Sequence, residues 1–352
     1  MLNDKNSSTS IASDRRPLDD ALQLGPRKRP CLSDPLVHYG RHFGCTIHAL
    51  CSVKAVMTNG MLRMAELQDQ PDDSFTPQER CEHRVFIQLL QMVPGLEERL
   101  FSGEEGEVLQ AAELIQRGVA STRSDDTKGL KGPILDWISP EGSSLTLPLS
   151  HSMKMDRGFQ HEATGRLLCP VGLDWSDAVT KEKLRSGALA VPGDQWPIFI
   201  YANNKFNEDD PWKGLLRGRL LVMAYKHVFT SPSSVEKEPK ATRSGNARIH
   251  GMTSVLSASI AYIAMQTRFS LSSSAVFLRS DLSTDLERFY NSIIEFLDDP
   301  EEAHEVRDLL TWWNRQVFPR YIPVSTSLLK HSALGCLKAR HALMRSSITT
   351  PL

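Results

Sequence analysis

Two apolar stretches decide the fold, DDPWKGLLRGRLLVMAYKHVF (209–229) and MTSVLSASIAYIAMQTRFSL (252–271). In the first stretch Leu215, Val222 and Phe229 recur every seven residues, which is a helical period and not that of a strand. We therefore predict a helix that starts near Pro211. The second stretch has no charged residue until its last turn and is apolar on nearly every side, which is typical of a buried helix. Because Ser, Thr and Gln dilute it below the content of a membrane span, we predict the central helix of a soluble domain.

Capping signals predict further helices around this centre. Thr76 followed by Glu79 has the spacing of a capping box, and the helix that it starts would end at Pro94. Asp299 before Pro300 is a second start signal. Apolar periodicity predicts the other helices, over 37–59, 104–117, 175–186 and from 284 onward. The run IFIYA (198–202) is the best strand candidate, and 121–131 is predicted to be a polar loop.

The composition fits one large domain or two modest ones. The chain has 352 residues, of which 40% are hydrophobic and 24% charged, so it can bury a substantial core. We predict a mainly α fold, an irregular helical domain over 34–320 with at most a small strand element. A domain sub-boundary is possible near 121–131. Residues 1–33 are predicted to be a disordered tail, and residues 321–352 are predicted to be a weakly helical tail.

The amino-terminal tail lacks the apolar region of a secretory signal, and the six cysteines include no CxxC pair. Both features favour an intracellular protein with reduced thiols. Arg27, Lys28 and Arg29 form a basic cluster between two prolines, a pattern that a nuclear import receptor reads. The alternatives are nuclear import and an inert basic tail.

A local excess of basic residues follows the first apolar stretch. From Lys213 to Arg248 there are eight Lys and Arg against two acids, whereas the whole chain has a formal net charge of -1. Any polyanion site must therefore be a local patch. The candidate contacts are Lys237, Lys240, Arg243 and Arg248, whose charges suit phosphates. The alternative is a solvated surface loop.

Two groups of residues have side chains that bind metals elsewhere. His38, His42 and Cys45 fall on one face of the predicted helix over 37–59, and zinc accepts imidazole and thiolate ligands. No fourth ligand follows at a recognised spacing, so we favour packing, and no metal or other cofactor is predicted. Asp209 and Asp210 could bind a divalent ion, although helix capping explains the same residues.

No enzyme signature is present, since the chain lacks a Walker loop, a GxSxG elbow, an HExxH pair and a dinucleotide fingerprint. The enzyme hypothesis is a metal-dependent enzyme on phosphorylated or nucleic-acid substrates, with Asp209, Asp210 and either His227 or His250 around the ion. We favour a protein that is not an enzyme.

Several long phrases carry a resemblance, among them DPLVHYGRHFG (34–44), GLDWSDAVTKEKLRSG (172–187) and HVFTSPSSVEKEPKATRSGNARIHGM (227–252). On these phrases the chain resembles a multi-copy family of uncharacterised proteins of mushroom-forming (basidiomycete) fungi. The resemblance implies an intracellular fungal protein and supplies no chemistry.

The leading hypothesis is an intracellular binding module whose basic patch contacts nucleic acid or an acidic protein partner. No contact with a membrane is predicted. The oligomeric state is left open.

Overall fold

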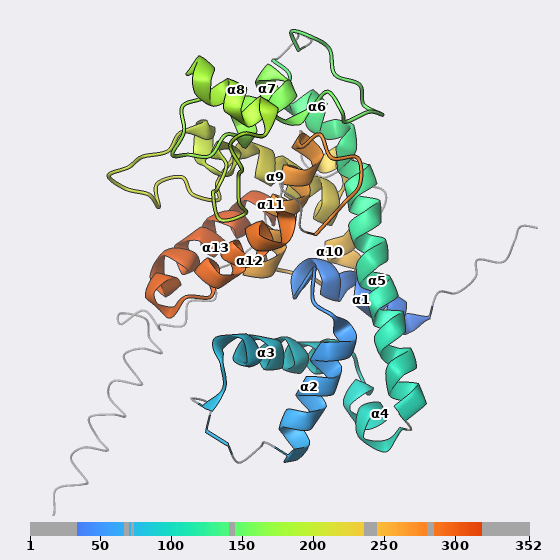
Figure 1. Ribbon diagram of the computed structural model, residues 1–352. Helices are drawn as coiled ribbons and strands as arrows, with labels where there is room; N and C mark the ends of the chain where they lie inside the picture. The colour runs from blue at the N-terminus through green and yellow to red at the C-terminus, as the bar shows by residue number, and fades with distance from the viewer. Residues whose placement is uncertain are drawn as a thin grey trace, which may run out of the picture. The chain divides into compact units, whose positions relative to one another are not determined.

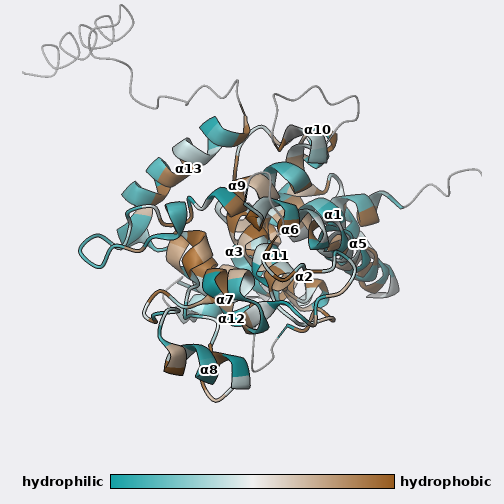
Figure 2. Ribbon diagram, turned by 90° about the horizontal axis from the view of Figure 1, so that it is seen from above, coloured by the Kyte–Doolittle hydropathy of each residue, from teal (hydrophilic) through white to brown (hydrophobic). Residues whose placement is uncertain are grey.

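The second apolar stretch forms the central helix of the fold, α11 (Ser257–Leu271), whose residues are buried from Ser259 to Leu271. Figure 2 shows α11 in the middle, with α5 (Glu105–Lys131), α8 (Ala178–Ser186) and α13 (Ala303–Val317) around it. The computed structural model describes residues 34–66, 70–71, 74–103, 105–140, 145–235, 245–279 and 285–318. The prediction of a mainly α fold is confirmed.

The remaining elements are also helical (Figure 1). The other α-helices are α1 (Pro35–Thr46), α2 (Val53–Glu66), α3 (Pro77–Met92), α4 (Leu96–Ser102), α6 (Pro133–Ile138), α7 (Glu162–Leu168), α9 (Arg219–Tyr225), α10 (Asn246–Ile249) and α12 (Leu286–Leu297). Short 3₁₀ turns lie at Gly158–Gln160, Ile198–Ile200, Ala202–Asn204, Pro232–Ser234 and Pro300–Glu302, and a π-helical turn extends α9 over Lys226–Thr230.

The strand predicted at 198–202 is wrong, because this segment forms two 3₁₀ turns with Phe199 and Ile200 buried. A short apolar run does not distinguish a strand from another buried segment, and the described part of the chain has no neighbouring strand that could pair with it. Within the described ranges, the one β feature is an isolated antiparallel bridge between Pro170 and Pro197.

The predicted loop over 121–131 is also wrong, because α5 runs through it without a break. Val119, Thr122 and Leu130 are buried along one side of this half of α5, at helical spacing. In the sequence Gly118 indicates a helix end. In the structure it allows α5 to cross close to α1. A Cβ on Gly118 would lie 2.3 Å from the carbonyl oxygen of Val37.

The single helix predicted over 37–59 is two helices, with a break between Thr46 and Val53. The His48 ring explains the break, because its Nδ1 accepts hydrogen bonds from the backbone amides of Leu50 (3.3 Å) and Cys51 (3.0 Å). A side chain that takes backbone amides locally competes with the helix ladder.

Two apolar clusters fill the interior. The larger surrounds α11 and includes Tyr225, Phe289 and Trp313, all fully buried. The smaller lies among α1 to α5 and includes Phe43 and Phe86. Residues 49 and 50, in the break after α1, belong to the larger cluster, so this short segment ties the two clusters together.

Polar contacts hold α11 in place along its length. Tyr262 donates its hydroxyl to Asp126 Oδ2 of α5 at 2.6 Å. At the carboxyl end, Lys154 Nζ donates to the carbonyl of Phe269 (2.5 Å) and Arg157 Nη1 to that of Ser270 (2.8 Å). The Phe269 carbonyl also accepts from the amide and the hydroxyl of Ser272, so the two basic side chains add donors at the carboxyl end of the helix, where positive charge complements its dipole.

Two domain predictions fall on residues that are not described, the tails at 1–33 and 321–352, and the division of the chain stays a prediction. The described residues from Pro35 onward belong to one compact unit. No helix in the described part of the chain is long and apolar enough to cross a membrane.

Candidate functional site

Two adjoining cavities lie side by side along helix α3. The large pocket has a volume of about 820 Å³ and the small pocket about 420 Å³. Both are lined by His48, Cys81, Val85 and Ile294, so these residues form the shared boundary. We call the two pockets together the α3 groove.

One face of α3 supplies a wall of the groove, because Cys81, Arg84, Val85 and Gln88 recur at helical spacing. The start of this helix was predicted correctly. Thr76 Oγ1 accepts the amide of Glu79, and the Glu79 carboxylate accepts the amide of Thr76 in return.

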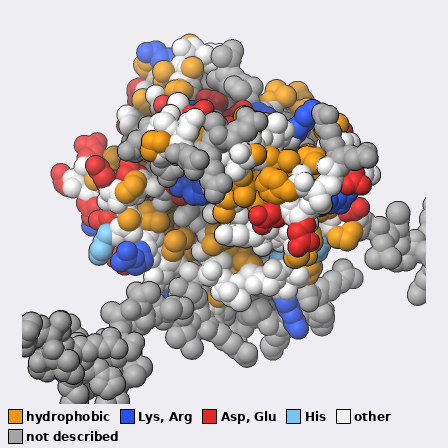
Figure 3. Space-filling model, turned by 90° about the horizontal axis from the view of Figure 1, so that it is seen from below, with side chains coloured by type: hydrophobic (Ala, Val, Ile, Leu, Met, Phe, Trp, Pro, Cys, Tyr) orange, Lys and Arg blue, Asp and Glu red, His pale blue; other side chains and the backbone are white. Residues whose placement is uncertain are grey.

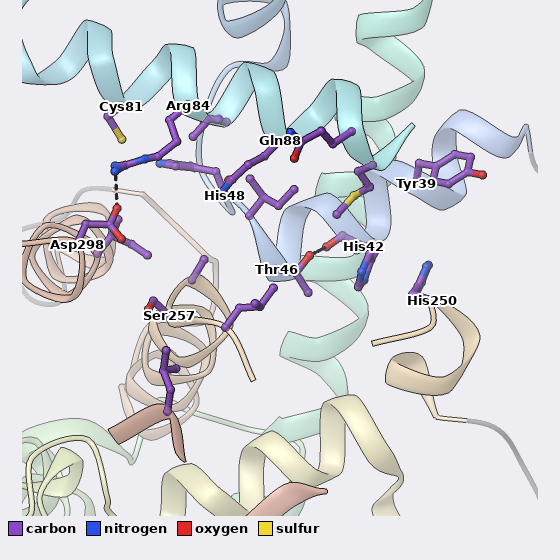
Figure 4. A pocket seen from close by; sticks show the side chains of 18 of the residues that line it. Tyr39, His42, Thr46, His48, Cys81, Arg84, Gln88, His250, Ser257 and Asp298 are labelled. Atoms are coloured by element: carbon purple, nitrogen blue, oxygen red, sulfur yellow. Dashed lines mark hydrogen bonds and ion pairs between the residues drawn. The ribbon is translucent and has the colours of Figure 1, made fainter. Parts of the chain in front are cut away.

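An ion pair joins this wall to the far side of the large pocket. Arg84 Nη2 of α3 lies 2.8 Å from Asp298 Oδ2, just after α12 (Figure 4). Burial raises the pKa of Asp298, and the charge of Arg84 opposes that shift. The Arg84 side chain is 51% exposed, so its remaining donors stay accessible.

His48 is a fixed hydrogen-bond donor at the boundary of the two pockets. Burial lowers its pKa to about 4, with a smaller effect from the charge of Arg279, so the ring is neutral at pH 7. Because Nδ1 accepts two backbone amides, the proton of the neutral ring is on Nε2. Nε2–H has no acceptor in the described ranges.

The first turn of α11 also opens on the large pocket, which Leu256, Ser257 and Ala258 line. Figure 4 shows this helix nearly end-on, with Ser257 facing the cavity. Leu256 donates its amide to Ser259 Oγ at 3.1 Å, but the amides of Ser257 and Ala258 have no acceptor among the residues described. The first turn contains no acidic residue, so its positive end is uncompensated.

Three imidazoles stack at the rim of the large pocket. His250, which follows α10, lies 4.3 Å from both His38 and His42 between ring centroids. Burial is the main cause that lowers the pKa of His42 and of His250 to about 4, and the neighbouring histidines add to it. Ring faces meet here, not nitrogen lone pairs, so the contact is packing. No group of three or more His, Cys, Asp or Glu in the described part could hold a metal ion.

The small pocket is more acidic than the large one. Glu82, Glu287 and Glu295 line it, together with one basic residue, Arg279. Arg279 Nη2 lies 2.6 Å from Glu287 Oε1 and also donates to the carbonyl of Leu50. A cationic or neutral group suits this end of the groove better than an anion.

Of the four predicted polyanion contacts, the structure describes only Arg248. It is exposed on α10, directly before Ile249 and His250 at the rim of the large pocket. Lys237, Lys240 and Arg243 lie outside the described residues, as do Arg27, Lys28 and Arg29. The polyanion and import sites therefore stay predictions.

The residues of the enzyme hypothesis do not form a site here. Asp209 and Asp210 are exposed in a turn and cap no helix. The start predicted near Pro211 is wrong, because Leu216 has a left-handed backbone (φ 52°) and α9 begins only at Arg219. His227 packs against Trp137, and His250 belongs to the imidazole stack.

Sequence reasoning missed the central members of the groove, Arg84, the amides of Ser257 and Ala258, and the donor role of His48. In the sequence His48 is only one more histidine after His38, His42 and Cys45. The signal that reveals it, two amides bound to Nδ1, exists only once the helix breaks after Thr46.

Comparison with known proteins adds a family but no activity. A family model described as "Family of unknown function (DUF6698)" matches residues 117–318. No curated protein and no solved structure matches the chain.

Proposed function

We propose that this chain, which belongs to the family of unknown function matched above, is an interaction module. It binds a peptide segment of a partner protein in the α3 groove. The observation that carries the proposal is the groove itself, a lined cavity that follows α3 from Pro77 to Met92.

The dimensions of the groove suit a peptide. At about 1.5 Å per residue the 16 residues of α3 span roughly 24 Å, which matches an extended segment of about seven residues. Val85, Ile294 and Leu310 supply apolar contact. Ile249 and Leu256 are 51% and 41% exposed at the rim, and apolar side chains left open in this way are typical of binding surfaces.

The charge of the groove favours a peptide over nucleic acid. Glu82, Glu287 and Glu295 would repel a phosphate backbone that followed the groove. On the face seen from below, basic and acidic side chains are interspersed and not sorted into a basic stripe (Figure 3). A peptide can place charges of either sign where the walls require them.

The predicted basic residues fit an acidic partner. Arg248 is next to the groove rim, and the predicted contacts Lys237, Lys240 and Arg243 precede it closely in the chain. A partner segment that leaves the groove beside α10 would meet Arg248. Nuclear import through Arg27, Lys28 and Arg29, and origin in mushroom-forming fungi, remain predictions from the sequence alone.

The test is a display selection of random ten-residue peptides on the full chain, followed by fluorescence anisotropy of the labelled winners. Gln88→Trp fills the large pocket from an exposed position on α3, so it leaves the fold intact. We expect at least tenfold weaker binding to this variant. Val179→Trp, on the exposed side of α8, is the matched control and keeps full affinity.

Two outcomes would overturn the proposal. One is a selection that returns only peptides bound equally by the Gln88→Trp variant. The other is a single-stranded oligonucleotide that binds the full chain at low salt and no longer binds the Gln88→Trp variant, while no peptide binds the full chain.

A further inference from the structure

The last part of the sequence differs in charge from the rest of the chain. Residues 319–352, which lie outside the described residues, contain five Lys and Arg and no Asp or Glu. The whole chain, by contrast, has 41 basic and 42 acidic residues. We call this segment the basic tail. Its side chains carry a formal charge of +5, so a negatively charged surface within its reach would attract it.

The basic tail also has an apolar pattern at helical spacing. On a helix over 328–345, most apolar residues would share one side, and Lys330, Lys338 and Arg345 would lie on the other. At about 1.5 Å per residue such a helix would be roughly 27 Å long, against roughly 24 Å for α3. An apolar side of this length is typical of peptides that lie in an apolar groove. The apolar residues of this side are Leu328, Leu329, Ala333, Cys336, Leu337, Leu343 and Met344.

The α3 groove has the opposite charge. Four acidic and two basic side chains line its two pockets, so the lining has a formal charge of -2. Asp298 and Glu287 are each paired with one of the two arginines. Glu82 of α3 accepts only from the neutral side-chain amides of Asn59 (3.1 Å) and Gln78 (3.0 Å) among the described residues. The Glu82 carboxylate is therefore available to a cation of a bound segment.

The described residues end within reach of this groove. Leu310 of α13 lines the large pocket, and α13 ends at Val317, about 10 Å further along the helix axis. Nine residues, 319–327, separate Phe318 from Leu328. When extended they span about 30 Å. Leu328 can therefore reach the groove of its own chain.

We infer that residues 328–345 bind in the α3 groove of the same chain and compete there with the partner peptide. Their apolar side packs on Val85, Ile294 and Leu310, and one of their basic residues pairs with Glu82. Because the segment is tethered to α13, its effective concentration at the groove is on the order of millimolar, so even a weak contact is mostly occupied. The inference rests on the proposed function, since it concerns the same groove, and it adds an autoinhibitory segment that the partner must displace.

The test is fluorescence anisotropy of a labelled peptide with the sequence of residues 328–345. Two proteins are compared, the full chain and the full chain with Leu337→Asp and Leu343→Asp, which disrupt the apolar side of its own tail. We expect the peptide to bind this tail variant at least tenfold more tightly, because the groove is no longer occupied. Adding Gln88→Trp to the tail variant should weaken binding at least tenfold, whereas adding Val179→Trp should leave it unchanged.

The charge contact is tested in the same tail variant. Glu82→Gln should weaken the peptide several-fold, and Glu113→Gln, at an exposed position of α5 outside the groove, is the matched control that should not. A peptide with Lys330→Gln, Lys338→Gln and Arg345→Gln should bind with and without Glu82→Gln equally. A loss that is the same for both peptides would contradict the pairing of the tail with Glu82.

Cross-linking of the unaltered full chain gives a second readout. A carbodiimide joins a carboxylate to a nearby lysine, so Glu82 should link to Lys330 or Lys338. The linked fraction should not depend on protein concentration, because the contact is within one chain. A fraction that falls on dilution would assign the groove to the tail of a second copy and overturn the inference.

The outcomes separate this inference from the proposed function. If the tail peptide binds the full chain and the tail variant equally, or still binds after Gln88→Trp, the tail does not occupy the groove and the inference is refuted. If the tail peptide does not bind the tail variant while selected peptides do, the inference falls and the proposed function stands. If no peptide of any kind binds either protein, both fall.

Discussion

Three partly buried histidines should make the stability of this protein depend on pH. Burial lowers the pKa of His42, His48 and His250 to about 4, against about 6.5 for an exposed ring. Between pH 6.5 and 4 the unfolded chain therefore binds more protons at these positions than the folded chain. The stabilisation is complete above pH 6.5 and is lost as the pH falls toward 4.

Two acids, Asp126 and Asp298, act in the opposite direction, because burial raises the pKa of both carboxyls. Burial raises the pKa of Asp126 to about 6, while the hydroxyl of Tyr262 opposes the shift. A raised carboxyl pKa stabilises the fold at low pH and loses that effect as the pH rises through 6. The three histidines outweigh the two carboxyls, so the net free energy of unfolding should still increase from pH 4 to 6.5.

Urea unfolding at half-unit pH steps measures this dependence. His42→Gln combined with His250→Gln should flatten the rise, because two of the three rings are gone. His304→Gln is the control, since this side chain is exposed on α13 and should leave the profile unchanged. A stability that is flat from pH 4 to 6.5 in the unaltered chain would contradict the burial of these rings.

At the scale of the helices, α1 and α5 cross with their backbones in contact. A Cβ on Gly40 would lie 2.2 Å from the carbonyl oxygen of Ile115, and one on Gly118 would lie 2.3 Å from that of Val37. These contacts are to backbone atoms, which cannot rotate away, so the helices would have to separate.

Gly118→Ala should therefore destabilise the protein by about 2–4 kcal/mol, despite the better helix propensity of Ala. Gly106→Ala is the matched control on the same helix, because a Cβ there would meet nothing within 4 Å. It should stabilise the protein by up to about 1 kcal/mol. Urea unfolding of both variants checks this, and equal effects would show that α1 and α5 are not in backbone contact.

Elements with local signals were predictable from the sequence. The capping box of Thr76 and Glu79 begins α3, and Asp299 Oδ1 accepts the amide of Glu301 at the turn before α13. Where the signal depends on a distant contact, prediction failed. Gly118 looks like a helix end in the sequence, and only the position of α1 shows why α5 continues past it.

The candidate site was less predictable than the helices. His38 and His42 were placed on one helical face, but the ring that stacks on them belongs to His250, from a segment that precedes α11. The α3 groove brings residues 38–92 against residues 249–310. No periodicity or spacing in the sequence records contacts of that range.

At the scale of the whole described unit, the region that matches the family model contains only one side of the groove. Residues 117–318 supply the start of α11 and the wall from α12 and α13, whereas His48 and all of α3 precede the match. The proposed peptide site therefore includes residues that the matched region does not contain.

The same division predicts that the matched region does not fold alone. It begins inside α5, so the surface on which α1 packs would be exposed. It also loses residues 49 and 50 of the larger cluster. Tyr290, fully buried, would lose the amide of Ala49 to which its hydroxyl bonds at 3.1 Å, and Arg123 would lose the carbonyl of the same residue.

We expect a fragment of residues 117–318 to unfold without a cooperative transition and to bind a hydrophobic dye, because a buried polar group left without its partner and an exposed helix face each cost several kcal/mol. A fragment of residues 35–318, which restores α1 to α4, should unfold cooperatively with a midpoint close to that of the full chain. Circular dichroism across a urea titration distinguishes them. If the shorter fragment shows the cooperative transition of the longer one, the break after α1 does not hold the two clusters together, and the groove between them is an arrangement of independent parts.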